Sequence, residues 1–171
     1  MDPFLTERLS VHSWQPTLDD REARLGLEIA LSEILSRRVL KHLPSPLHLS
    51  GDDDIASWVD ERAEESDVFL VKWRRSSELV GLLILASDPS DSQAPELHIG
   101  YLLGEATWGQ GVATELVQGL VSAAEKDGPV RLLGGVSIEN PASARVLEKA
   151  GFELSPDLST TNSPMYSKKV G

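Results

Sequence analysis

Apolar residues repeat with two different periods along this chain of 171 residues. Alternation of apolar and polar residues, as in residues 8–14, is typical of a strand with one buried face. A repeat every three to four residues, as from Leu25 to Val39, is typical of an amphipathic helix. On this basis strands are predicted over residues 8–14, 68–73, 79–86, 96–103, 130–138, 152–154 and 165–169. Helices are predicted over residues 17–40, 112–126 and 141–150, and another is predicted to begin at 51.

The order of these elements bounds the fold class. Antiparallel strands come first and a strand–helix–strand crossover follows, which favours an α+β domain over a doubly wound one. We expect a mixed, mostly antiparallel sheet of about seven strands, flanked by about four helices. The chain is long enough for one domain with a full core and short for two, so residues 1–171 are predicted to form a single domain. Residues 88–95 and 155–164 are polar and are expected to form surface loops.

Composition removes several classes of function. The chain has no cysteine, which excludes disulfides, thiolate metal sites and a cysteine nucleophile. Its four histidines show no metal-binding spacing, so no metal site is expected. A formal net charge of −11 argues against nucleic acid and mildly favours a cationic partner, such as an amine or a basic peptide. No apolar run is long enough to span a membrane and no signal peptide is evident, which predicts a cytoplasmic location.

The run from Thr107 to Glu115 carries the strongest candidate chemistry. It lies between a predicted strand and a predicted helix, an order that aims several backbone N–H groups at one point. A helix N-terminus carries about half a positive charge and unsatisfied donors, so it is a ready anion site. Gly109 and Gly111 let a phosphate approach the backbone without a Cβ in the way. Because Glu105 is the only charged residue between Leu103 and Ala113, phosphate binding here is expected to come from backbone amides.

A second segment later in the chain reads Asn-Pro-Ala-Ser-Ala-Arg-Val-Leu-Glu-Lys-Ala-Gly-Phe, residues 140–152. Asn140 followed by Pro141 is a common helix N-cap and first-turn pair that needs no function. Asn140, Ser143 and Leu147 follow a spacing that places them on one face of the helix. Either segment alone is weak evidence for a function, but the two together, in this order, form a specific pattern.

This order of elements and the two segments resemble the GNAT superfamily of acetyl-CoA-dependent N-acyltransferases. The closer likeness is to the branch that contains the ribosomal-protein N-terminal acetyltransferases. The shared segments are Thr6-Glu7-Arg8-Leu9, Gly100-Tyr101, Trp108 to Glu115 and Asn140 to Phe152. The resemblance covers nearly the whole chain and implies the GNAT fold. It identifies acetyl-CoA as the acyl donor better than it identifies the acceptor.

The resemblance also implies which residues hold acetyl-CoA. The diphosphate is expected on the N–H groups of the glycine turn, and the pantetheine arm along the strand before it. Asn140 is expected to touch the cofactor as well as to cap a helix. The cofactor-binding residues implied in this way are Leu102, Leu103, Trp108, Gly109, Gln110, Gly111, Val112, Ala113, Thr114, Asn140 and Ser143.

Direct acetyl transfer requires a neutral amine to attack the thioester, and an acceptor of high pKa needs a base. Many relatives carry a glutamate where this chain has His98, whose side chain has an intrinsic pKa suited to base chemistry. Glu96 lies two residues earlier and shares its strand face. Tyr101 is expected to pack beside the cofactor. The candidate catalytic residues are His98, Glu96 and Ser143.

The superfamily often places a tyrosine near the thiol, and this chain has Leu147 at that position. Ser143 is the candidate to help the leaving thiol there, and its alternative role is a polar residue in the first helical turn. These departures keep open a second interpretation, a coenzyme A-binding module with little or no transferase activity. A phosphate-loop protein is the least favoured, because the turn lacks Gly-Lys-Ser/Thr. The acceptor is expected to be a protein N-terminus or a small-molecule amine. Homodimers are common in this branch, and nothing in the sequence establishes one here.

Overall fold

The computed structural model describes residues 1–41, 43, 48–49, 54–88 and 95–171. These residues form one eight-stranded sheet with the strand order β1-β2-β3-β4-β5-β6-β8-β7. The strands are β1 (Phe4–Leu5), β2 (Leu9–Ser13), β3 (Asp67–Trp73), β4 (Leu79–Asp88), β5 (Glu96–Leu103), β6 (Val130–Gly135), β7 (Glu153–Leu154) and β8 (Met165–Val170). All neighbouring pairs are antiparallel except β5 and β6, which are parallel.

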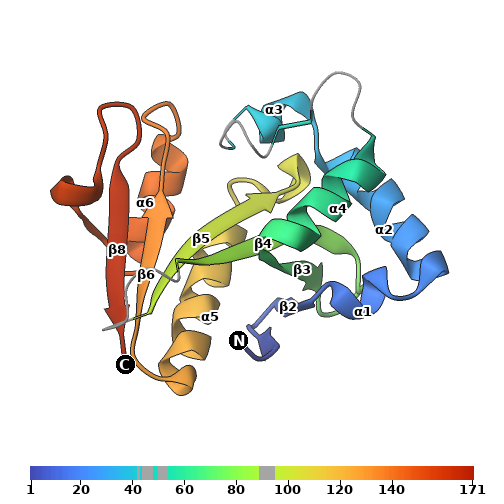
Figure 1. Cartoon of the computed structure of the whole chain (residues 1–171), viewed down its shortest axis with the longest axis horizontal. Helices are drawn as coiled ribbons and strands as arrows, with labels where there is room; N and C mark the ends of the chain where they lie inside the picture. The colour runs from blue at the N-terminus through green and yellow to red at the C-terminus, as the bar shows by residue number, and fades with distance from the viewer. Residues whose placement is uncertain (42, 44–47, 50–53, 89–94) are drawn as a thin grey trace.

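Six α-helices in the described residues cover the sheet (Figure 1). They are α1 (Gln15–Leu18), α2 (Arg21–Ile34), α3 (Arg37–Leu40), α4 (Ile55–Glu65), α5 (Val112–Asp127) and α6 (Pro141–Lys149). There are also two short 3₁₀ turns, Glu105–Thr107 before α5 and Pro156–Leu158 after α6. None of the described helices is long and apolar enough to cross a membrane.

The helices form two layers because the central strands are apolar on both faces. In β3, Phe69 and Val71 belong to the core cluster under α5 and α6. Val68 and Leu70 alternate with them and belong to the cluster under α2 and α4. Strands covered on both faces read as continuous apolar runs, as residues 68–71 and 82–85 do. The predicted α+β class and mixed, mostly antiparallel sheet are therefore confirmed, with one more strand than expected.

The helix predicted over residues 17–40 is divided into three helices. The side chain of Asp20 accepts a hydrogen bond from the Ala23 N–H at 2.8 Å, so α2 begins after it. The hydroxyl of Ser36 likewise accepts from the Val39 N–H and caps α3. Asp and Ser side chains compete with the backbone in this way, and the competition favours helix starts over helix interiors. The predicted helix start at residue 17 is also wrong, since Thr17 lies inside α1.

Two other predicted segments lie partly outside the described residues. The helix predicted to begin at 51 is described from Asp54, whose side chain caps α4 by accepting from the Ser57 N–H. Most of the loop predicted over residues 88–95 also falls outside.

The strand predicted over residues 96–103 has those same bounds, and the helices predicted from 112 and 141 begin at those residues.

A gap between β5 and β6 determines where the candidate site lies. The two strands pair only where Glu96–His98 meet residues 131–133. Beyond this point β5 stays with β4 as far as Leu103, while β6 stays with β8 as far as Gly135. The sheet therefore opens as a wedge, visible between the two strands in Figure 1. The end of β5 leads through the 3₁₀ turn directly to the start of α5.

The packing makes a prediction for two glycines. A Cβ on Gly81 would overlap the backbone carbonyl of Leu102 on β5, which cannot move aside. Gly81→Ala is expected to lower the free energy of unfolding by about 2 kcal/mol. Gly26 lies exposed inside α2 with nothing within 4 Å of an added Cβ. Gly26→Ala is therefore expected to raise the free energy of unfolding by about 0.5–1 kcal/mol. Urea unfolding of both variants checks this, and equal midpoints would contradict it.

Candidate active site

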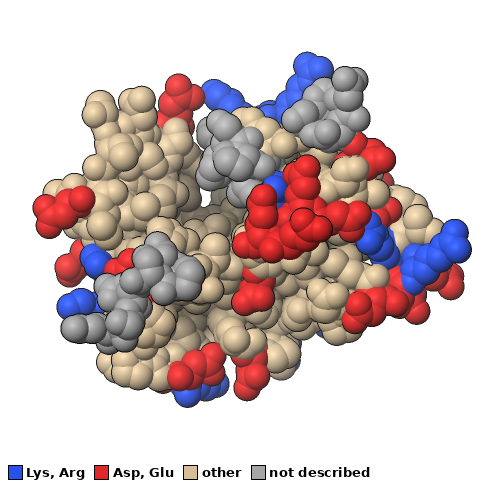
Figure 2. Space-filling view, viewed as in Figure 1, with Lys and Arg blue, Asp and Glu red and all other residues tan. Residues whose placement is uncertain are grey.

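A cleft of about 740 Å³ occupies the wedge between β5 and β6. Its walls include the ends of these two strands, the glycine turn before α5 and one face of α6. Figure 2 shows the molecule hollowed between the part that carries β6 and β8 and the part that carries α3 and α4. Within the described part of the chain, the ionisable side chains that line the cleft are His98, Tyr101, Arg145 and Lys149, with no carboxylate among them.

The glycine turn has the conformation that its sequence suggests. Gly109 and Gly111 have φ angles of 73° and 76°, in the left-handed region that favours glycine. Gly111 is the N-cap of α5, and no side chain caps this helix. The first N–H groups of the helix are therefore left for another acceptor, and Gly111, Val112, Ala113 and Thr114 all line the cleft.

The other turn residues support this loop. Gln110 is not among the residues that line the cleft, and its side-chain amide donates to the Ala106 carbonyl at 2.6 Å. The indole N–H of Trp108 donates to the Leu103 carbonyl at 2.8 Å. On its outer side the Trp108 ring meets the Arg38 guanidinium, 5.5 Å from the ring centre. Trp108 therefore links the end of β5, the turn and α3.

The free edge of β5 presents backbone groups to the cleft. The Gly104 N–H donates to the Val80 carbonyl on β4. Because backbone groups of successive strand residues point to opposite sides, Leu102 faces β4 while Tyr101 and Leu103 face the wedge. The contact from Trp108 to the Leu103 carbonyl agrees with this direction. Of the two strand residues that the resemblance implies, Leu103 is placed to offer its backbone to a ligand and Leu102 is not.

Tyr101 and Ser143 meet across the cleft. Their hydroxyl oxygens lie 2.7 Å apart and share a hydrogen bond. Burial raises the pKa of the Tyr101 phenol, and the hydrogen bond with Ser143 partly offsets this. Leu147, on the same helix face as Ser143, is almost fully buried in the core. The sequence analysis gave Tyr101 only a packing role; the Gly100-Tyr101 pair was the available signal, but the contact with Ser143 could not be read from it.

Asn140 serves as a helix cap. Its side-chain carbonyl accepts from the Ser143 N–H at 3.1 Å, which fixes the first turn of α6. Asn140 also lines the cleft, so the structural interpretation holds and the cofactor-contact interpretation stays a prediction. Capping holds Ser143 in the position where it meets Tyr101.

His98 and Glu96 have different surroundings although they lie on the same strand. His98 is exposed and lines the cleft where β5 and β6 begin to diverge. Glu96 is not among the lining residues, and its carboxylate accepts from Arg131 at 3.1 Å. Only His98 of this pair therefore opens onto the cleft.

Two cations that the sequence analysis did not single out lie on α6. Arg145 and Lys149 both line the cleft and are separated by one helical turn. Neither has an ion pair with a described residue. Glu105, which precedes the turn, is engaged by the Ser36 hydroxyl at 2.5 Å and Arg38 at 2.6 Å. The cleft thus has more positive character than the turn alone suggests.

A family model for the acetyltransferase (GNAT) domain matches residues 15–153. The chain belongs to the GNAT acetyltransferase family. This confirms the family inferred from the resemblance, and solved structures confirm its fold. No curated protein sequence matches this chain. Among the described residues no group of His, Asp or Glu side chains could hold a metal ion.

Several solved GNAT structures superpose over nearly the whole chain. An acetyltransferase from Bacillus anthracis has a TM-score of 0.74 at 20% identity, with 97% of each chain covered. The ribosomal L7/L12 α-N-protein acetyltransferase RimL, solved with coenzyme A, has a TM-score of 0.73 at 17% identity, with 98% of each covered. The microcin C7 self-immunity acetyltransferase MccE, solved with acetyl-CoA and AMP, has a TM-score of 0.66 at 16% identity, covering 96% of this chain and 93% of its own. At these identities the likeness is one of fold.

The Tyr101–Ser143 contact predicts a spectroscopic titration. Tyr166→Phe leaves Tyr101 as the single tyrosine, because the chain has two. Its ionisation, followed by tyrosinate absorbance, is expected above the ordinary pKa of tyrosine, since burial is the larger effect. Adding Ser143→Ala removes the hydrogen bond that lowers the pKa and is expected to shift the ionisation to still higher pH. The stability that Tyr101 contributes is present below its ordinary pKa and is lost as pH rises through the folded value. An ordinary pKa in both variants would contradict the contact.

Proposed function

We propose that this chain transfers the acetyl group of acetyl-CoA directly to a primary amine. The observation that carries the proposal is that one cleft collects the uncapped N-terminus of α5, the free edge of β5, His98 and the Tyr101–Ser143 pair. Membership of the GNAT family supports it. Structures of RimL with coenzyme A and of MccE with acetyl-CoA support the donor, because they share this fold.

The lining of the cleft fits the chemical groups of acetyl-CoA. The N–H groups of Gly109, Gly111, Val112, Ala113 and Thr114 suit a diphosphate, which needs several donors, and no carboxylate lines the described part of the cleft. Arg145 and Lys149 add positive charge for phosphate oxygens. Trp108 occupies the Leu103 carbonyl, but the Leu103 N–H and the backbone groups of Tyr101 face the wedge and suit an arm that carries amide groups. Trp108 and Asn140 hold the loop and the helix that border this space.

The reaction that these residues support is a single displacement. The amine nitrogen bonds to the acetyl carbon as the carbon–sulfur bond breaks, and no cysteine is present to carry the acetyl group first. His98 accepts the proton that the amine loses. Coenzyme A leaves as a thiolate, and the Ser143 hydroxyl stabilises its sulfur by donating a hydrogen bond while keeping its own proton. Tyr101 holds Ser143 through their shared hydrogen bond. Glu96 is less suited to act as a base because Arg131 occupies its carboxylate.

The acceptor is proposed to be a protein N-terminus or a small-molecule amine. The described part of the cleft wall carries no carboxylate, so an amine inside it is favoured in its neutral, reactive form. Acidic side chains gather outside the cleft, over α4, as Figure 2 shows. Together with the net charge of −11 they favour approach of a cationic molecule. A cytoplasmic location stays a prediction of the sequence, and a homodimer stays a possibility that comes only from the resemblance.

A second candidate is a coenzyme A-binding module with little or no transferase activity. The buried Leu147, at the position where relatives often carry tyrosine, is the observation that favours it. Turnover with a panel of amines, followed by thiol release, separates the two proposals. Thiol release with at least one amine supports the enzyme. Tight acetyl-CoA binding without release for any amine in the panel would favour the module.

The donor site is tested by adding one negative charge to the turn. Thr114 lines the cleft in the first turn of α5, where a carboxylate is compatible with the helix dipole. Thr114→Glu is therefore expected to keep the folded stability and to weaken acetyl-CoA binding about tenfold or more, because the carboxylate repels phosphate. Ser122→Glu makes the same charge change at an exposed position of α5 away from the cleft and is the matched control. Calorimetric titration checks both, and equal affinities would place the phosphates elsewhere.

The role of His98 is tested with acceptors of different pKa. An amine with a pKa of about 10 is mostly protonated at neutral pH and depends on a base, whereas an α-amine of about 8 depends on it little. His98→Ala is expected to lower kcat/KM about 100-fold for the first kind and much less for the second. His12→Ala, which alters a histidine outside the cleft, serves as control. The same loss for all amines would remove His98 as the base.

A further inference from the structure

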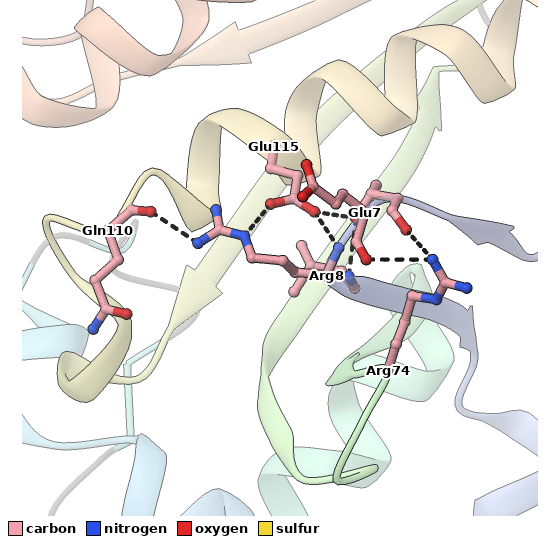
Figure 3. A network of polar contacts seen from close by, with 7 residues as sticks. Glu7, Arg8, Arg74, Gln110 and Glu115 are labelled. Carbon is pink, nitrogen blue, oxygen red and sulfur yellow. Dashed lines mark hydrogen bonds and ion pairs between the residues drawn. The ribbon is translucent and has the colours of Figure 1, made fainter.

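The N-terminal segment of the chain reaches the glycine turn through Arg8. Its guanidinium donates from Nη1 to the Gln110 carbonyl at 3.1 Å and from Nε to the Glu115 carboxylate at 2.6 Å (Figure 3). The Arg8 backbone N–H and the Thr6 hydroxyl also donate to Glu115, at 2.7 and 2.5 Å. One arginine thus joins the turn to the first helical turn of α5, although neither the resemblance nor the proposed chemistry assigns it a role.

The contact with Gln110 determines where the next amide points. The carbonyl of Gln110 and the N–H of Gly111 belong to one peptide unit, and in a trans peptide these two groups point in opposite directions. Arg8 and Gln110 are not among the residues that line the cleft, whereas Gly111 is. Holding the carbonyl toward Arg8 therefore turns the Gly111 N–H toward the cleft. That N–H has no acceptor among the described residues.

The contact with Glu115 controls charge at the same place. Glu115 lies in the first turn of α5, close to the N–H groups that are proposed to hold the diphosphate. Burial alone would raise the pKa of the Glu115 carboxyl, but the hydrogen bonds from Thr6 and Arg8 lower it overall. Glu115 is therefore ionised at neutral pH. Without a partner its charge would repel a phosphate, and Arg8 supplies that partner.

We propose that Arg8 is a positioning residue for the acyl donor: it aims the Gly111 N–H into the cleft and neutralises Glu115 beside the diphosphate. The inference rests on the proposed function, since it assumes that the turn binds the diphosphate of acetyl-CoA. It also gives a role to the Thr6-Glu7-Arg8-Leu9 segment, which was noted in the sequence only as part of a resemblance. Arg8 is not among the residues that line the cleft, so its role is to position the turn.

Comparing two acyl donors tests this inference in the full-length protein. Acetyl-CoA carries the diphosphate, and S-acetylpantetheine lacks it. Arg8→Ala is expected to raise the Kd of acetyl-CoA about tenfold, as loss of a charged hydrogen-bonding group does. Its Kd and kcat/KM for S-acetylpantetheine are expected to match those of the unaltered protein. If Arg8 only supported folding, Arg8→Ala would weaken the binding of both donors to the same extent.

Three further variants separate the two effects of Arg8. Arg8→Lys keeps the positive charge but lacks the planar fork that spans Gln110 and Glu115, so an intermediate loss of acetyl-CoA affinity is expected. Adding Glu115→Gln to Arg8→Ala removes the unpaired charge and is expected to restore part of the affinity. Arg74→Ala is the matched control, because Arg74 binds the carbonyls of Thr6 and Glu7 in the same segment but contacts neither Gln110 nor Glu115. Its acetyl-CoA affinity is expected to be unchanged.

The outcomes are distinguishable. Unchanged acetyl-CoA affinity in Arg8→Ala, or equal losses for the two donors, would overturn the inference and leave the proposed function standing. Failure of the unaltered protein to bind acetyl-CoA would overturn the proposed function itself, and the inference with it. Thermal unfolding of each variant identifies any loss of affinity that comes from loss of the folded state.

Discussion

The short parallel pairing of β5 with β6 is the constraint on which the rest of the molecule depends. A strand inside a sheet normally has both edges occupied, but β5 loses its partner after His98 and continues beside β4 alone. Each strand keeps a long antiparallel partner on its other side, so the sheet stays paired on both sides of the opening. The opening leaves unpaired backbone groups that water or a ligand must satisfy. It also provides room for a cleft that reaches into the middle of the sheet.

The two helices that follow the diverging strands place their N-termini beside this opening in different ways. α5 begins at a left-handed glycine with no side-chain cap, so its first N–H groups stay available. α6 begins at Asn140, which occupies the Ser143 N–H and so holds the Ser143 hydroxyl in register with Tyr101. One helix start is open and suited to an anion, and the other is closed and suited to fixing a side chain. The division of roles follows from the residue at each N-cap.

Local sequence was sufficient for the elements whose ends are determined by neighbouring residues. The strand at 96–103 and the helices that begin at 112 and 141 follow from apolar period, glycine and proline. The division of residues 15–40 into three helices was missed because Asp20 and Ser36 could equally lie inside a helix or cap one. Tertiary packing decides whether such a side chain caps a helix or lies inside one. The spacing of apolar residues in the sequence carries no information about that packing.

The site was predicted in part, for the same reason. The turn residues form one contiguous run, so the sequence alone predicted that they lie together. The pairing of Glu96 with Arg131, by contrast, joins residues 35 positions apart, and the contact of Tyr101 with Ser143 joins residues 42 apart. Arg8 is 102 residues from Gln110. No pattern in the sequence ranks these partners above others, because the topology of the sheet is what brings them together.

The separation of Arg8 from α5 has a consequence for the order of folding. Gly109 and Gly111 can adopt their left-handed conformation as soon as residues 109–111 have left the ribosome. The N-terminal segment that carries Arg8 is made earlier, but it cannot orient the turn until α5 has been made. Closing a loop of 107 residues is slow compared with forming α5. A nascent chain therefore has the helix before it has the oriented amide. The ability to bind the acyl donor should therefore arise late in folding, when the first strands dock against α5.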